Sequence, residues 1–356
     1  MEAAATQART EPVRVRGLTP LWVCVAVAFL LVSLVLGVVA GPVDIGVGAI
    51  LQSLAAHLHL PGATSSLNPV DNAILWQLRV PRVVLAALVG MMLALSGATY
   101  QGVFRNPLAD PYLLGVAAGA GLGATIAIAY VPNGVDAHRL IPPAAFLGGI
   151  SAVVVAYAIG RSAGRERDSV TLILAGVTVA SFFTAIQAFV QQRHADTLQQ
   201  VYSWILGGLP TSGWSDVWLI LPYVVVSSTI MLLYRRVIDV MSVGDEEAAT
   251  LGINVRRTRL LLVIAATIGT AAAVAVSGLI AFVGIIVPHA IRLLTGAGYR
   301  ALLPLSAIAG AGFLVLCDVI ARTAAAPAEI PIGIITAFFG APFFAIVLRS
   351  TKGGSR

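Results

Sequence analysis

One stretch, residues 79–123, constrains the fold of this chain more than any other. It places two arginines around Pro81 and then runs through about twenty mostly apolar residues, the length that crosses a bilayer as a helix. A polar break, Arg105-Asn106-Pro107, interrupts it before apolar sequence resumes. Glycines then recur at every fourth position, at Gly115, Gly119 and Gly123. The pattern predicts two membrane helices with a tight turn between them and glycines where helices approach closely.

The composition extends this interpretation to the whole chain. Of the 356 residues, 58% are hydrophobic and only 11% are charged, with a mean hydropathy of +0.92. Because soluble domains carry about 25% charged residues, we expect an all-α polytopic membrane protein. The net charge of +6 falls in short clusters between apolar runs, which favours membrane topology over a nucleic-acid partner. Both cysteines lie in apolar runs and the sequence has no cluster of metal-ligand motifs, so no metal or cofactor is expected in this chain.

Apolar runs of membrane-spanning length recur along residues 21–349. They predict one transmembrane domain of about ten helices between two short cytoplasmic tails, 1–20 and 350–356. The runs are 21–40, 82–103, 111–131, 142–160, 169–190, 214–234, 260–276, 279–294, 302–320 and 332–348. Residues 41–78 are expected to form an outer loop, 204–209 a short interfacial helix on the outer side, and 235–259 the longest inner segment.

The basic residues set the orientation of these runs. With both termini in the cytoplasm, only five of the 22 lysines and arginines fall on the outer side: Arg79, Arg82, Arg139, Arg193 and Arg322. Cytoplasmic loops of membrane proteins carry an excess of Lys and Arg. The bias therefore predicts a multi-pass protein of the cytoplasmic (inner) membrane with both termini inside.

Three of the outer arginines, Arg79, Arg82 and Arg322, lie at the ends of apolar runs. Arginines in such places anchor helices by extending to lipid headgroups. Guanidinium groups gathered on one face would equally suit bidentate capture of carboxylates on an extracytoplasmic partner. Anchoring and docking both stay open at this point. Glu329, which precedes the last apolar run, is placed to pair with Arg322.

On the inner side, residues 244–252 have the pattern of a compact helix. Asp245 and Glu246 crowd its start, where the helix dipole favours negative charge, and Gly252 is placed to end it. Such a helix is either a solvated connector or a surface offered to a cytoplasmic subunit.

Several chemistries lack their motifs in this sequence. There is no P-loop, and the one lysine is Lys352, so this chain is not expected to bind ATP itself. No zinc-protease motif or nucleophile elbow supports a membrane-embedded enzyme. Acidic residues are nearly absent from the spans, Asp318 being the exception, whereas carriers coupled to ion gradients usually need intramembrane carboxylates. A channel or secondary carrier is therefore the weaker alternative, and the energy for transport is expected from another subunit.

The longest motifs resemble those of the membrane permeases of type II ABC importers, the group that takes up iron-siderophore complexes, haem and cobalamin. The resemblance covers nearly the whole chain from the first span onward. It rests on 78–82 (LRVPR), 96–97, 106–116 (NPLADPYLLGV), 174–177 (LAGV), 204–208, 244–252, 284–293 and 321–333.

This resemblance implies ten helices per subunit and a homodimer with the translocation path on its two-fold axis. It implies two ATP-binding cassette subunits that hold ATP-Mg, and an extracytoplasmic substrate-binding protein. The first cargo implied is an iron(III)-siderophore complex, with cobalamin or haem as alternatives. In the implied mechanism, closure of the ATPase subunits rocks the helices that border the path.

The resemblance also assigns roles to residues. Docking of the binding protein falls to Arg79, Arg82 and Arg322. The ATPase coupling helix comprises Gly244, Asp245, Glu246, Ala249, Leu251 and Gly252. The cytoplasmic gate falls near Ser169 and Val170, although the cobalamin member has a second small hydroxyl residue where this chain has Val170. Helix packing and helix breaks are expected at Gly97, Asn106, Pro107, Gly115, Gly119 and Pro288.

Overall fold

The computed structural model describes residues 18–57, 59, 65–131, 137–162, 169–210, 213–296 and 298–352, and this part of the chain is helical without strands. The helices are α1 (Pro20–Val39), α2 (Val47–His57), α3 (Pro69–Ala73), α4 (Val80–Val103), α5 (Val116–Ala129), α6 (Ala137–Ser162), α7 (Ser169–Arg193), α8 (Leu198–Ile205), α9 (Trp214–Leu233), α10 (Arg235–Val243), α11 (Asp245–Thr250), α12 (Val255–Ser277), α13 (Val283–Thr295), α14 (Tyr299–Thr323) and α15 (Ile332–Lys352). A π-helical turn, Ile74–Arg79, joins α3 to α4, and a 3₁₀ turn, Ala195–Thr197, precedes α8.

Seven helical segments are long and apolar enough to cross a membrane. They coincide with seven of the ten predicted spans and comprise α1, α3 to α4, α6, α7, α9, α12 and α14. The other three predicted spans fall on shorter apolar helices, α5, α13 and α15. The all-helical membrane fold is thus confirmed, while the count of ten spans and the placement of the termini stay predictions.

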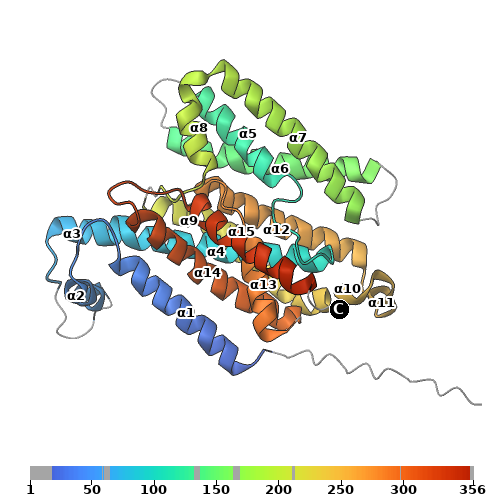
Figure 1. Ribbon diagram of the computed structural model, residues 1–356, viewed down its shortest axis with the longest axis horizontal. Coiled ribbons are helices and arrows are strands. Elements are labelled where there is room, and N and C mark those ends of the chain that lie inside the picture. Colours follow the sequence, from blue (N-terminus) through green and yellow to red (C-terminus); the bar gives the residue numbers. More distant parts are fainter. Residues whose placement is uncertain are drawn as a thin grey trace, which may run out of the picture.

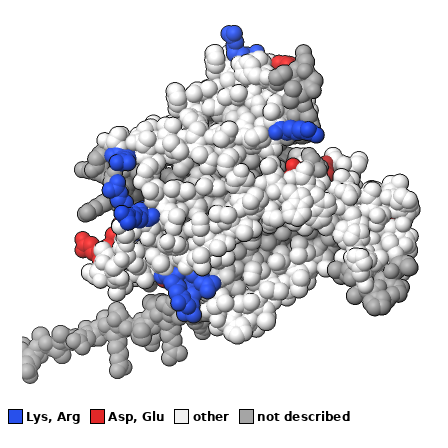
Figure 2. Space-filling model, turned by 180° about the vertical axis from the view of Figure 1, so that it is seen from behind, with Lys and Arg blue, Asp and Glu red and all other residues white. Residues whose placement is uncertain are grey.

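Helix α4 forms the centre of the structure (Figure 1), and 78% of its apolar segment is buried, against 17% for α1. It packs against α9, α12, α13 and α14, and α1 covers α14 from outside. A second group, α5 to α8, lies along the other side of α12. Viewed from behind (Figure 2), charged side chains lie toward the ends of the helices, with a broad uncharged area between them. That distribution suits a bundle surrounded by lipid.

Glycines allow the helices of both groups to approach closely. A Cβ added at Gly97 of α4 would lie 1.9 Å from the carbonyl oxygen of Gly284 in α13. One added at Gly119 of α5 would lie 2.2 Å from the carbonyl oxygen of Gly148 in α6. Such contacts leave no room for any side chain, as expected for small residues at membrane helix interfaces. The four-residue glycine spacing in the sequence therefore corresponds to the α5–α6 contact.

The turn between α4 and α5 is longer than the sequence indicates, because α5 begins at Val116 and not at residue 111. Side chains of the turn accept hydrogen bonds from backbone N–H groups that would be bonded within a helix if the helix continued. Asn106 Oδ1 accepts from the Leu108 N–H at 3.0 Å, and Asp110 Oδ1 accepts from the Tyr112 N–H at 2.7 Å. Gly115 then takes a left-handed conformation, with φ of 87°, directly before α5.

Residues 41–78 are not a loop, contrary to the sequence prediction. They contain α2, α3 and most of the π-helical turn. Helix α3, this turn and α4 form one continuous helical segment, Pro69–Val103. The helix passes Pro81, which cannot donate a backbone hydrogen bond. The π-helical turn lies immediately before it, and the Val80 N–H bonds the Leu75 carbonyl oxygen five residues back.

The short outer helix was also predicted at the wrong place. Helix α8 occupies Leu198–Ile205 and ends where 204–209 was expected to be helical. Gly207 takes a φ of 73°, and the Gly208 N–H donates to the Ser277 carbonyl oxygen at 2.8 Å. Residues 206–209 of the apolar run are therefore a turn that packs on the end of α12.

The contact between α4 and α13 yields a stability prediction. We expect Gly97→Ala to lower the free energy of unfolding by about 3 kcal/mol or more, because the obstructing atoms are backbone. Gly48→Ala in α2, where an added Cβ meets nothing within 4 Å, is the control and should be neutral or stabilising. Thermal unfolding in detergent measures both. Equal melting of the two variants would contradict this packing.

Candidate functional site

An ion-pair cluster joins three elements at the N-terminal end of α4, which the sequence predicts to lie on the outer side. Arg82 donates from Nε to Asp318 Oδ1 at 2.9 Å and makes two further bonds, both 2.9 Å, to the carboxylate of Glu329. Asp318 Oδ2 also lies 3.3 Å from Arg322 Nε. The Asp318 side chain is only 1% exposed, whereas that of Glu329 is 51% exposed. The paired, bidentate geometry with Glu329 is the strong form of a guanidinium–carboxylate contact.

The other two outer arginines are buried, at 4% exposure for Arg79 and 3% for Arg322. Arg79 donates to the carbonyl oxygens of Val38 at 3.3 Å and Val39 at 3.1 Å, and Arg322 donates to that of Gly37. These carbonyls belong to the last turn of α1, where no intrahelical donor remains. Both arginines therefore cap α1, as cations near a helix C-terminus favourably do.

This arrangement corrects two expectations from the sequence. Three exposed guanidinium groups on one face do not occur, because α1 folds back over Arg79 and Arg322. Glu329 pairs with Arg82 and not with Arg322. Arg82 is the one of the three whose partner faces solvent. Its hydrogen bonds lower the pKa of Glu329, which lies in the loop before α15, so this carboxylate is ionised at neutral pH.

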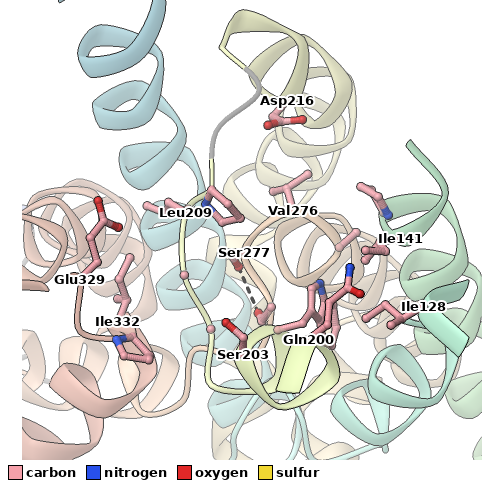
Figure 3. Close-up of a pocket in the computed structure, with 18 of the residues that line it drawn as sticks. Ile128, Ile141, Gln200, Ser203, Leu209, Asp216, Val276, Ser277, Glu329 and Ile332 are labelled. Carbon is pink, nitrogen blue, oxygen red and sulfur yellow. Dashed lines mark hydrogen bonds between the residues drawn. The ribbon is translucent and has the colours of Figure 1, made fainter. Parts of the chain in front are cut away.

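A cavity of about 620 Å³ opens beside this cluster. Figure 3 shows Gln200 and Ser203 of α8 on one side, Glu329 and Ile332 on the other, and Ser277 between them at the end of α12. The remaining labelled lining residues are Ile128, Ile141, Leu209, Asp216 and Val276. The wall is thus mixed, with amides, hydroxyls and carboxylates set among apolar side chains.

Backbone hydrogen bonds fix one wall of this cavity. The Ile332 N–H donates to the Gly207 carbonyl oxygen at 2.9 Å, and the Gly333 N–H to that of Leu206 at 3.2 Å. Together with the bond from Gly208 to Ser277, they tie the turn after α8 to the ends of α12 and α15. Three segments far apart in the sequence therefore form one rigid rim.

A second ion-pair cluster lies at the opposite end of α4, predicted to be the inner one, around Asp245. Its carboxylate accepts from Arg105, in the turn after α4, at 3.0 Å and from Arg259 of α12 at 3.0 Å through both oxygens. Asp245 is also the first residue of α11, where a carboxylate is favourable. The cluster holds α11 against the ends of α4 and α12.

Helix α11 is shorter than the predicted helix at 244–252, since it covers Asp245–Thr250 and ends before Gly252, which has a φ of 80°. Ala248 is the residue of this helix whose side chain is buried. Glu246 and Ala249 of the helix are exposed, as are Leu251 and Gly252 directly after it. The exposure of Leu251 is 70%. Gly244 is buried in the bend that precedes the helix. An apolar side chain is therefore exposed directly after a short helix that ion pairs hold in place.

The remaining predicted residues lie apart from these clusters. Ser169 and Val170 begin α7, but their side chains lie outside the described part of the structure. Pro288 is buried inside α13, while Asn106 and Pro107 lie in the turn after α4. In the described residues, no group of three or more His, Cys, Asp or Glu is placed to hold a metal ion.

One internal link was missed from the sequence. Gln101, buried in α4, accepts from Arg292 of α13 at 2.9 Å and donates to the Gly284 carbonyl oxygen at 3.3 Å. The Arg292 guanidinium carbon also lies 5.4 Å from the ring centroid of Tyr299. The sequence did contain a signal for this link, because Gln101 is an amide side chain in a mostly apolar span and a buried polar group needs a hydrogen-bond partner.

Comparison with known proteins places these features in a family. The profile of the FecCD transport family matches residues 29–350. The chain is 45% identical over 279 residues to the cobalamin import system permease protein of Halobacterium salinarum, which covers 78% of this chain and 74% of that protein. It is 37% identical over 327 residues to the iron(3+)-hydroxamate import system permease protein of Bacillus subtilis, covering 90% of this chain and 84% of that one.

Among solved structures, the fold is similar to a metal-chelate type ABC transporter in an inward-facing conformation. The TM-score is 0.80 at 29% identity, and the match covers 93% of this chain and 100% of the other. On the family match across 29–350, this chain belongs to the FecCD transport family, as a multi-pass membrane permease of ABC importers.

Proposed function

We propose that this chain is the permease subunit of an ATP-driven importer that moves an iron(III)-siderophore complex across the cytoplasmic membrane. It would act as a homodimer with two separate ATP-binding cassette subunits, which hold ATP-Mg, and with an extracytoplasmic substrate-binding protein. The observation that carries this proposal is the match in fold along almost the whole length of an ABC transporter chain. Family membership and the names of the relatives add support.

The inner cluster supports a coupling role for α11. The helix offers Leu251 and Ala249 outward, while Asp245 ties it to Arg105 and Arg259. Because those arginines belong to the turn after α4 and to α12, a force applied to α11 acts directly on two long helices. This is the arrangement that rigid-body motion of helices requires.

The outer cluster supports a docking role centred on Arg82. Arg79 and Arg322 donate hydrogen bonds to the end of α1, so their contribution is to hold α1 against α4 and α14. Arg82 already binds one carboxylate in bidentate geometry at a partly exposed position. We therefore propose that a carboxylate of the binding protein exchanges with Glu329 on the Arg82 guanidinium.

The cavity supports passage of a large, mixed-polarity solute. Its walls combine amides and hydroxyls with apolar groups, and the charged side chains among the lining residues are the paired Arg82 and Glu329 together with Asp196 and Asp216. Selection of the cargo would then fall to the binding protein. Cobalamin is the second candidate cargo, favoured by the 45% identity to a cobalamin permease, and haem is a third.

The structure weakens the alternative of an ion-coupled secondary carrier. Asp318, the acidic residue buried within α14, is paired with Arg82 and Arg322. A carboxylate held by two guanidinium groups is poorly suited to bind and release a proton or sodium ion.

The coupling role predicts the effect of changing Leu251. We expect Leu251→Glu to lower co-purification with the ATPase subunit at least about tenfold, because it places a charge in an apolar contact. Leu251→Met keeps the apolar surface and should retain binding. Unimpaired assembly of the Leu251→Glu variant would exclude α11 from the interface.

The docking role predicts opposite effects for the two partners of one ion pair. Glu329→Gln removes the internal competitor and should lower the binding-protein concentration that half-maximally stimulates ATP hydrolysis. Arg82→Gln should raise that concentration by about tenfold or more, as for loss of one partner of a close charge pair. Arg193→Gln, at the exposed outer end of α7, serves as the control. Identical stimulation curves for all variants would overturn the exchange.

The cargo is tested on the complete importer. Proteoliposomes with permease, ATPase and binding protein should accumulate a ferric siderophore only when ATP is present on the ATPase side. Uptake of cobalamin or haem instead would replace the cargo and leave the permease role intact. Uptake without ATP would favour a channel or carrier.

A further inference from the structure

We propose that α2 is an interfacial helix that lies on the outer surface of the bilayer beside α1 and inserts one apolar stripe into the lipid. The stripe consists of Val47, Leu51 and Leu54. The argument depends on the orientation of α2, on the contacts that fix its rotation, and on the chemistry of the face left open.

Helix α2 lies across the direction of the membrane helices. In Figure 1 it is seen nearly end-on, at the end of the bundle where α4 begins, whereas α1, α4 and α14 run lengthwise across the picture. Its inner face is anchored there, because Ile50 and Ile45 form a buried cluster with Leu75 of the π-helical turn. Val38 and Val39, the last residues of α1, pack against the same cluster. The helix therefore lies at the level where the first span ends.

Specific contacts fix which face of α2 points away from the protein. Ser53, fully buried, accepts a hydrogen bond from Trp76 Nε1 at 3.0 Å. The ring of His57 stacks on that of Trp76 at a centroid distance of 3.8 Å. Both contacts are to the helical segment that leads into α4. With Ile50 and Ser53 turned inward, most residues on the rest of the helix surface, including some beside this buried face, are exposed.

The exposed strip next to the buried face is apolar. Val47, Leu51 and Leu54 are 51%, 59% and 43% exposed, and their spacing of four and three residues places them on one face. Helix α2 contains no Asp, Glu, Lys or Arg. A helix with this pattern, lying in the plane of the interface, buries its apolar face at the boundary between headgroups and acyl chains.

The neighbouring surface identifies the occupant as lipid. Helix α2 meets the end of α1 through the buried cluster with Val38 and Val39. The exposed residues in the same half of α1 are also apolar: Leu31, Val32, Val35 and Leu36. Since α1 is a span with most of its surface open, that surface faces acyl chains. Trp76, beneath α2, is the residue type enriched at this depth. The stripe therefore continues the lipid-facing surface of α1.

Site-specific quenching in nanodiscs tests this position. A Cys24→Ala background removes the exposed native thiol, and Leu51→Cys then carries an environment-sensitive fluorophore. Gln52→Cys, one residue further along α2 and also exposed, is the matched control. Nanodiscs made of phosphatidylcholine and phosphatidylglycerol contain a fraction of phospholipid spin-labelled near the headgroup.

We expect the label at position 51 to be quenched severalfold more by the spin-labelled lipid than the label at position 52, and severalfold less by aqueous iodide. Equal quenching of both labels by iodide would overturn the proposal, because the stripe would then face water. Protection of position 51 from both quenchers would also overturn it, since another protein surface would cover the stripe. The test uses the full chain alone and is independent of the transport assays.

Discussion

One buried carboxylate, Asp318, organises the outer end of this protein. It contacts Arg82 of α4 and Arg322 of its own helix, and through them it is connected to Glu329 and to the end of α1. A guanidinium at the membrane boundary with no partner is costly, and removing one partner of a buried pair typically costs about 3–5 kcal/mol. The positions of three helix ends therefore depend on a single acidic side chain.

At the other end of α4 a carboxylate again pairs with two arginines, but the three side chains come from different elements. There the carboxylate is Asp245 on a short surface helix, and the arginines come from the turn after α4 and from α12. Helix α4 is thus flanked by a charge cluster at each end, with Arg82 on one side and Arg105 on the other. Close glycine contacts along its length make it a stiff element between the two surfaces proposed to meet partners. Helix α4 therefore links the two surfaces through a single helix.

Much of this organisation could be predicted from the sequence. Apolar run length identified the long helices to within a few residues, for example 302–320 against Tyr299–Thr323. The break at Asn106-Pro107 and the glycine spacing near Gly119 correspond to a turn and to a close helix contact. Residues 41–78 were misjudged because α2 is short and buries only a small part of one face, so its periodicity hardly differs from that of a mixed loop.

The sequence by itself determined that this chain is a helical membrane protein, which end of each span carries charge, and where its spans are interrupted, because hydropathy and backbone hydrogen-bond requirements act locally. Only the tertiary structure decided which charges meet. Arg79 and Arg322 cap α1, and Glu329 pairs with Arg82, over separations of 40 to 285 residues. Such partners are selected by how helix ends converge in space, and no local pattern encodes that convergence.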